Sequence, residues 1–423
     1  MHRSQALLNK IILLFALRIL SYFTLFPHSV LLTQAMKTGL RLALTLGAFL
    51  MLKSLKDGTA KRGECHTLHF SYENLTPLLL YVSYLLLGLG SLAWATQPSF
   101  ALLQWCMVAE ALAFAWFFMH LLGYYNSLSD GHARLPLVFG RAALFICIGF
   151  LIGMFADPDT FFRKTHEGEV ARLGGIIINP NELGMLAVLL GVMAYSELLD
   201  KRPKALNLLA LAVSMAVVFF TQSRSSLLAF LLVTAIFVLR SGRLRLMLFF
   251  AVAVAAAMPF VFYAVFLKQG DVAEVMSLTG RLPFWKDLLA EGFTQRPLFG
   301  YGFMCIADGE YFHSVHSYAA QMTHNTFAQV LLNLGLVGFA ICLLQMVATF
   351  FTIGKEAAKS HGALAGWMLV PLLFNSFTEF GIFGQSNYGI QFYQMLVLLF
   401  VVKTGPATSA RPHVFQLTKM AAA

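Results

Sequence analysis

Long runs of hydrophobic residues, separated by short polar segments, fill the chain from its start to about residue 402. The runs are roughly 16–25 residues long, which is the length that crosses the hydrocarbon core of a bilayer as a helix. They do not alternate polar and apolar residues, so the pattern favours helices over strands. We expect an all-α, polytopic membrane protein with about twelve transmembrane helices, over residues 11–32, 39–52, 75–95, 100–123, 138–156, 181–199, 206–222, 225–240, 246–267, 324–353, 363–381 and 386–402. The first run is interpreted as an uncleaved span, and the second is short for a span.

Composition supports a membrane protein and argues against a nucleic-acid partner. Hydrophobic residues make up 58% of the chain and charged residues only 12%, against about 25% charged in an average soluble domain. The net charge is +10, but no basic stripe with interleaved aromatic residues and no nucleic-acid motif occurs. The surplus is explained better by cytoplasmic loops that face anionic membrane lipids.

The distribution of lysine and arginine predicts the orientation. An even number of spans places both termini on one side, and most of the 30 basic residues fall in inside segments if that side is the cytoplasm. The remaining outside basic residues are Lys37, Arg41, Arg163, Lys164, Arg172, Arg224, Lys268, Arg281, Lys286 and Arg296. We expect a single domain over residues 1–423, with a large loop on the outside of the membrane over 268–323. Within this loop, apolar residues at helical spacing over 282–293 predict an amphipathic helix at the membrane surface.

Outside arginines have no role as topology signals, so they need another explanation. Arg224 stands in a bare hinge between two apolar spans, and Arg281 opens the amphipathic segment. Guanidinium groups bind phosphate oxygens in a bidentate manner, although an interfacial or solvated arginine is an equally simple interpretation. His324 lies where the tenth span begins, and a helix N-terminus disfavours the charged imidazolium. It is therefore a candidate general base, or simply a capping histidine.

Three asparagines and two aspartates are weaker candidates. Asn179 followed by Pro180 is a common helix start, and Asn181 and Asn325 stand at span starts, where they support or cap. Asp157 and Asp159 resemble an acidic pair for a divalent metal, but a loop turn explains them better. No HExxH, Walker, GxSxG or dinucleotide-binding motif occurs. We therefore expect no metal and no cofactor.

At these positions the chain resembles the O-antigen ligase and polymerase superfamily of bacterial polysaccharide assembly. Order and spacing agree over roughly 180–340. The matching segments are Asn179–Gly184, Ser223-Arg224, Arg281 with Trp285, Pro297–Gly302, His324–Thr326 and Leu334–Gly338. One departure is Ser225, where a small residue such as glycine often follows the arginine. The compact length is similar to that of the ligases of this superfamily.

The resemblance implies a glycosyltransferase of lipopolysaccharide biosynthesis in the bacterial inner membrane, with a periplasmic active site. Its donor would be an O-antigen glycan on undecaprenyl diphosphate and its acceptor lipid A–core. Transfer would be inverting and independent of metal. Arg224 and Arg281 would bind the diphosphate, and His324 would be the essential histidine. Open alternatives are a polymerase of the same superfamily, a transporter or flippase for lipid-linked glycans, and a structural membrane scaffold.

Overall fold

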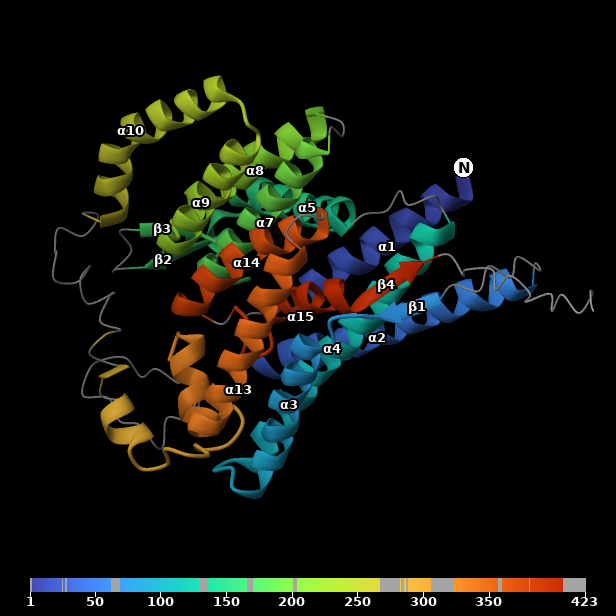
Figure 1. Cartoon of the computed structure of the whole chain (residues 1–423). Coiled ribbons are helices and arrows are strands. Elements are labelled where there is room, and N and C mark those ends of the chain that lie inside the picture. The colour runs from blue at the N-terminus through green and yellow to red at the C-terminus, as the bar shows by residue number, and fades with distance from the viewer. Residues whose placement is uncertain are drawn as a thin grey trace, which may run out of the picture.

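The protein is a bundle of helices with two small two-stranded sheets (Figure 1). The computed structural model describes residues 2–24, 26, 29–61, 69–128, 135–165, 170–200, 204–266, 282, 285–286, 288–305, 323–356, 360–379 and 381–405. Its helices are α1 (His2–Leu20), α2 (Val30–Lys61), α3 (Thr76–Gly90), η1 (Ser91–Ala93), α4 (Pro98–Leu128), α5 (Leu135–Ala156), α6 (Pro158–Phe161), α7 (Pro180–Leu199), α8 (Lys204–Thr221), α9 (Arg224–Arg240), α10 (Leu244–Phe266), η2 (Leu288–Phe293), α13 (Thr326–Glu356), α14 (Ser360–Thr378) and α15 (Tyr388–Val401).

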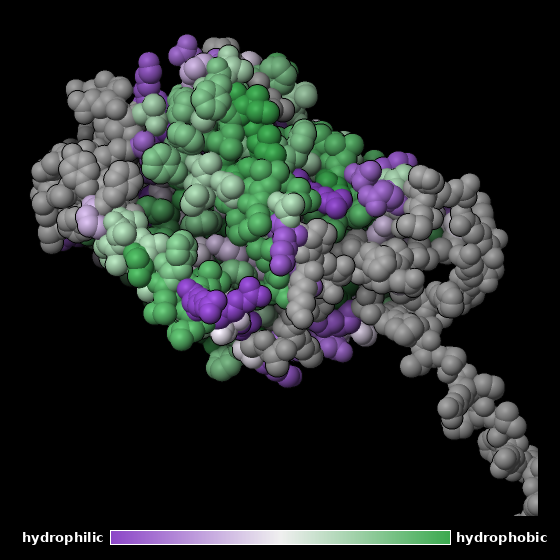
Figure 2. Space-filling view, turned by 90° about the horizontal axis from the view of Figure 1, so that it is seen from above, coloured by the Kyte–Doolittle hydropathy of each residue, from purple (hydrophilic) through white to green (hydrophobic). Residues whose placement is uncertain are grey.

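Within this described part, seven helices are long and apolar enough to cross a membrane. They begin in α2, α3, α4, α5, α7, α8 and α13, and shorter apolar segments lie in α10, α14 and α15. The surface agrees, because large apolar side chains such as Phe155 (80% exposed) and Leu31 (79% exposed) face outward. Figure 2 shows hydrophobic residues covering much of the face in view. The chain is therefore a multi-pass membrane protein, although the expected total of about twelve spans is not confirmed.

The two N-terminal spans differ from the prediction. The run 11–32 is not one helix, because α1 ends at Leu20 and α2 starts at Val30. Pro27 lies between them, and a proline interrupts a helix because it lacks an amide hydrogen. The short run 39–52 belongs to a helix of 32 residues. This helix continues through Lys37 and Arg41, because tertiary contacts shelter these charges and they need no loop.

The helices α7 and α15 form the centre of the bundle. Every residue of α7 from Leu183 to Tyr195 is buried, and so is every residue of α15. Around α7 pack α5, α8, α9 and α14, and α15 packs against α4 and α14. The N-terminus of α7 is consequently surrounded by the ends of other helices, which is where the candidate site lies.

The two antiparallel two-stranded sheets lie at opposite ends of the bundle (Figure 1). The strand β1 (His69–Tyr72) pairs with β4 (Val402–Gly405), close to the N-terminus of the chain. The strand β2 (Phe162–Thr165) pairs with β3 (Val170–Leu173) in the expected external loop between α5 and α7. The described chain therefore begins and ends at one end of the molecule, and β2 and β3 belong to the other.

A loop inserted into a break in α13 joins two of the sequence motifs. Gly335 has φ 64° and ψ −163°, so the helix is interrupted there. The carbonyls of Pro297 and Leu298 accept hydrogen bonds from the amides of Leu336 (2.8 Å) and Val337 (3.2 Å). In return, the amides of residues 301 and 302 donate to the carbonyls of residues 332 and 333 at 3.1 and 2.9 Å. The loop thus satisfies the backbone groups that the break leaves without helical partners.

The segment 282–293 is helical where the structure describes it, and it ends in η2. Its apolar side packs against the protein, and not only against the membrane surface as predicted. Leu288 is buried against Leu332 of α13, and Trp285 and Phe293 pack against the same pair. The described apolar residues of this segment therefore pack against the first half of α13.

Candidate functional site

His324 is held by a carboxylate from a distant part of the chain. Its Nδ1 lies 2.9 Å from Oε2 of Glu379, which follows the last residue of α14. The His324 side chain is 30% exposed, whereas that of Glu379 is only 8% exposed. A hydrogen bond from Nδ1–H to the carboxylate fixes the ring and leaves Nε2 as the basic nitrogen. The backbone of His324 has φ 50°, an uncommon conformation for a residue with a side chain.

Asn181 extends this pair into a chain of hydrogen bonds. Its side-chain amide donates to the other oxygen of Glu379, Oε1, at 3.1 Å. Its carbonyl oxygen accepts from Nη2 of Arg172 at 2.8 Å, and Nε of Arg172 donates to the carbonyl of Thr221 at 3.0 Å. Both carboxylate oxygens of Glu379 are therefore engaged, which holds the acceptor for His324 in one orientation. Arg172 ties this chain to the end of α8.

Arg224 begins α9 beside the same group. Ser223 caps the helix, its hydroxyl accepting from the amide of Ser226 at 3.3 Å. The Ser226 hydroxyl reaches the carbonyl of Asn181 at 3.5 Å, and Thr378 donates to the Ser225 hydroxyl at 3.4 Å. The start of α9 thus packs against the residue before Glu379 and against the α7 N-terminus. The Arg224 side chain is half-buried there.

The segment before α13 is fixed by three groups. The indole Nε1 of Trp285 donates to the carbonyl of Thr323 at 2.7 Å. Gln329 accepts from the Thr323 amide at 3.2 Å and from its hydroxyl at 3.1 Å. The Asn325 side chain accepts from the amides of residues 327 and 328 at 2.9 and 3.0 Å, so it caps α13. These contacts hold the backbone on both sides of His324.

The other sequence candidates have different outcomes. Asn179 caps α7 as expected, accepting from the Asn181 amide at 2.9 Å. Asp157 caps α6 and accepts from the amide of Thr160, which is the loop-turn interpretation. Arg281 lies outside the described residues. Among those that are described, no group of three or more His, Cys, Asp or Glu residues could hold a metal ion.

The matched family covers this cluster. Residues 208–343 fit a family model described as O-antigen ligase, and this segment includes Arg224 and His324. This match supports membership of the chain in the O-antigen ligase/polymerase superfamily. No curated protein matches the chain. Membership in this superfamily indicates an enzyme of the glycosyl-transfer type that acts on lipid-linked polysaccharide and a lipid acceptor.

The superfamily segment does not contain every member of the cluster. Asn181 and Arg172 precede it, and Glu379 follows it, 55 residues after His324. Sequence reasoning did not select Glu379 as a site residue and placed Arg172 only among the outside charges. The available signal for Glu379 was its position: it is a carboxylate in the last turn of an otherwise apolar expected span, on the same expected side as His324.

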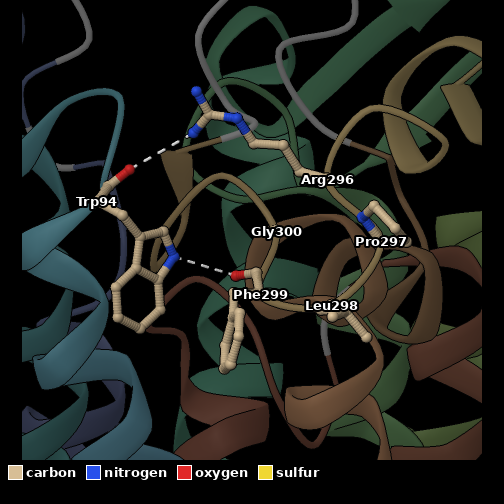
Figure 3. Close-up of a pocket in the computed structure, with 6 residues that line it drawn as sticks. All are labelled: Trp94, Arg296, Pro297, Leu298, Phe299 and Gly300. Carbon is tan, nitrogen blue, oxygen red and sulfur yellow. Dashed lines mark hydrogen bonds between the residues drawn. The ribbon is translucent and has the colours of Figure 1, made fainter.

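A cavity of about 500 Å³ lies beside the loop that enters the break in α13, and it is lined by Trp94, Arg296, Pro297, Leu298, Phe299 and Gly300 (Figure 3). The Trp94 indole donates to the Phe299 carbonyl at 3.1 Å, and Arg296 donates to the Trp94 carbonyl at 3.5 Å. Burial raises the pKa of the neighbouring Tyr301 phenol, which Arg296 partly opposes. Tyr301 therefore stays a donor, and its hydroxyl donates to the Gly292 carbonyl at 2.8 Å. These hydrogen bonds hold the loop of residues 296–301 to Trp94 and to Gly292.

Proposed function

We propose that this superfamily member is an O-antigen ligase. It transfers a glycan from undecaprenyl diphosphate to lipid A–core at the periplasmic face of the inner membrane, with inversion and without a metal. The observation that carries the proposal is the His324–Glu379 pair, whose histidine begins α13 inside the segment that matches the O-antigen ligase model. The partly exposed ring can meet a substrate, while the buried carboxylate orients it.

His324 acts as the general base for the acceptor hydroxyl. Its Nδ1–H is bonded to Glu379, so Nε2 accepts the proton as the hydroxyl oxygen attacks the sugar carbon. The diphosphate leaves from the opposite face of that carbon, which inverts the configuration. A positioned general base contributes about 10²–10⁴-fold to the rate. The membrane holds both lipid-linked substrates in one plane, which lowers the entropic cost of their meeting.

Arg224 and Arg281 stabilise the departing diphosphate. The assignment of Arg224 is supported by its place at the start of α9, packed against the Asn181 and Glu379 region. The assignment of Arg281 rests on the resemblance and on sequence distance, since it precedes by four residues Trp285, whose indole is bonded next to His324. Preorganised cations meet the negative charge as it develops, so proton donation to the leaving group is unnecessary.

Replacing Glu379 with glutamine tests the orientation of the base. Glutamine keeps the size and removes the charge, so Nδ1–H loses its anionic acceptor and the useful tautomer is less favoured. We expect kcat to fall about 10²-fold or more, with the donor KM unchanged. Glu379→Asp should recover part of kcat. Steady-state kinetics on purified protein measures both constants, and an unchanged kcat in Glu379→Gln would remove the positioning role.

Replacing Arg224 with alanine tests the charge at the leaving group. Loss of one preorganised donor costs about 2.7–4 kcal/mol of transition-state stabilisation, so kcat/KM should fall by a factor of about 10²–10³. Arg163→Ala is the matched control, because Arg163 is an exposed arginine on β2 in the expected external loop. Equal kcat/KM values in the two variants would contradict the role of Arg224.

The acceptor distinguishes the ligase from the polymerase, because both use the same donor chemistry. The test supplies purified enzyme with lipid-linked glycan, with or without lipid A–core, and separates the products by size and lipid. The ligase account predicts glycosylated lipid A–core and no elongation of the donor. Elongated lipid-linked glycan would identify a polymerase, and donor moved intact across liposomes would identify a transporter.

A further inference from the structure

A second group of cations lies on α2, at the same end of the bundle as His324. Lys37 and Arg41 are four residues apart on this helix, so both lie on one face. The side chain of Arg41 is only 4% exposed. Its Nη1 donates to the Ser386 hydroxyl at 3.3 Å, and its guanidinium lies 3.8 Å from the ring centroid of Tyr22. Its Nε is buried and has no hydrogen-bond partner.

The carboxylates near Arg41 are engaged elsewhere. Both oxygens of Glu110 accept from Arg18, at 2.7 and 2.8 Å, and Thr45 donates to the same carboxylate. Glu182 accepts from the Asn387 amide at 3.2 Å. The ion pairs that join two described residues are Arg18–Glu110 and His324–Glu379, and neither includes Arg41. Glu110 and Glu182 interact favourably with the Arg41 charge, but neither forms an ion pair with it. The buried Nε therefore remains a charged donor without an acceptor, which is costly and calls for a bound anion.

Lys37 adds a second positive charge to the same place. Its Nζ donates to the Thr24 hydroxyl at 3.2 Å, and the side chain is half-buried. It is close enough to Arg41 and Glu182 for electrostatic interaction with both. Glu182 offsets only part of the repulsion between the two cations, because it forms an ion pair with neither. The two cations together therefore form a better site for a dianion than either alone.

This group adjoins the catalytic cluster. Asn181 and Glu182 are consecutive residues at the N-terminus of α7. Asn181 bonds to Glu379 of the catalytic cluster, and Glu182 interacts with Lys37, so this helix end lies between the two groups. Ser386 and Asn387 belong to the segment that follows Glu379 and leads into α15. The same segment is fixed to α13, because the Thr326 hydroxyl lies 3.3 Å from the carbonyl of Glu379 and 3.2 Å from that of Phe383.

We propose that Lys37 and Arg41 form a phosphate-binding subsite, which holds a phosphate group of one of the lipid substrates beside the catalytic histidine. This inference rests on the proposed function for its choice of ligand, since both substrates of the ligase carry phosphate. The source is either the diphosphate of the donor or a phosphate of the lipid A–core. Charge-assisted hydrogen bonds from an ammonium and a guanidinium are the interactions that such a group requires.

The test measures dissociation constants of the purified full-length protein in detergent for two probes. Farnesyl diphosphate represents the donor, and phosphorylated lipid A represents the acceptor, with dephosphorylated lipid A as the uncharged comparison. The variants are Lys37→Ala, Lys37→Arg and Arg41→Gln, and Arg163→Ala is the control. We expect Lys37→Ala and Arg41→Gln to raise the Kd of one phosphate probe about tenfold or more. Lys37→Arg and Arg163→Ala should leave that Kd unchanged.

The probe that responds identifies the source of the phosphate. If Lys37→Ala leaves both dissociation constants unchanged, or if the wild type binds neither probe, the subsite is overturned. In that case a lower melting temperature of Arg41→Gln would show a purely structural role. This result is separate from the proposed function. If the subsite is overturned, the wild type can still transfer glycan, and the ligase proposal stands. Conversely, a wild type that binds phosphate but transfers nothing would overturn the ligase proposal and retain the subsite.

Discussion

The His324→Ala variant loses glycan transfer while it remains folded and still binds its donor. The imidazole is the group that accepts the acceptor proton, and alanine leaves no base in its position. We expect turnover to fall by a factor of about 10²–10⁴. Donor binding depends on cations elsewhere, so the dissociation constant for a polyprenyl diphosphate should change little. The measurement is single-turnover transfer with saturating donor and acceptor, together with the melting temperature.

The side-chain environment makes this variant a fair test of chemistry. His324 is 30% exposed, and its recorded hydrogen bond is the one to Glu379. Removing the ring therefore leaves no large cavity, although it leaves Glu379 without that donor. The Asn181 bond to the other oxygen remains. Wild-type turnover in a folded His324→Ala protein would eliminate the general-base mechanism.

Replacing Gly335 with alanine produces the largest loss of stability. The backbone there has φ 64° and ψ −163°, a conformation that only glycine adopts without strain. An added Cβ would also overlap the backbone carbonyl of Leu298 in the inserted loop. Strain and overpacking together cost roughly 2–6 kcal/mol in the free energy of unfolding. Because the first half of α13 carries His324, activity should fall as well.

The matched control for this prediction lies on the same helix. Gly354 belongs to α13, and a Cβ built on it would meet nothing within 4 Å. Gly354→Ala should change the free energy of unfolding by no more than about 1 kcal/mol, with alanine the better helix former. Thermal unfolding of both variants in the same detergent gives the comparison. Equal melting temperatures for Gly335→Ala and Gly354→Ala would contradict the account of the inserted loop.

Local sequence signals predicted most helices and several of their starts. The apolar runs from residue 75 onward overlap α3, α4, α5 and later helices, because an uninterrupted apolar run of this length signals a membrane helix. Asn179 with Pro180 predicted the start of α7, since capping chemistry is local. Similarly, the position of Asn325 predicted its capping role at α13.

Features that depend on distant contacts could not be read from local patterns. The helix α2 extends through Arg41 because Tyr22 and Ser386, far away in sequence, shelter the charge. The break at Gly335 is visible only when the loop of residues 297–302 is placed inside it. Glu379 reaches His324 across 55 residues. The candidate base was therefore found from sequence, whereas its orienting partner required the fold.

The ordered motifs also have unequal meanings in the structure. Pro297–Gly302 and Leu334–Gly338 contact each other and stabilise the break in α13. Asn181 and His324 instead meet through Glu379, and the start of α9, which carries Arg224, packs against them. The motifs thus separate into two groups: the loop contacts at the break in α13, and the polar cluster around Glu379. Substitutions at the break in α13 should mainly lower stability, and substitutions in the polar cluster should mainly lower turnover.

The most direct test of the central claim is transfer by the purified wild-type protein in liposomes that contain EDTA. The liposomes hold undecaprenyl-diphosphate-linked glycan and lipid A–core, and the products are separated and quantified over time. The account predicts that glycan-bearing lipid A–core and free undecaprenyl diphosphate form in equal amounts. A strict need for added Mg²⁺ would contradict the metal-free mechanism and return attention to Asp157 and Asp159. No transfer to lipid A–core, with the donor elongated or moved intact across the bilayer, would contradict the ligase itself.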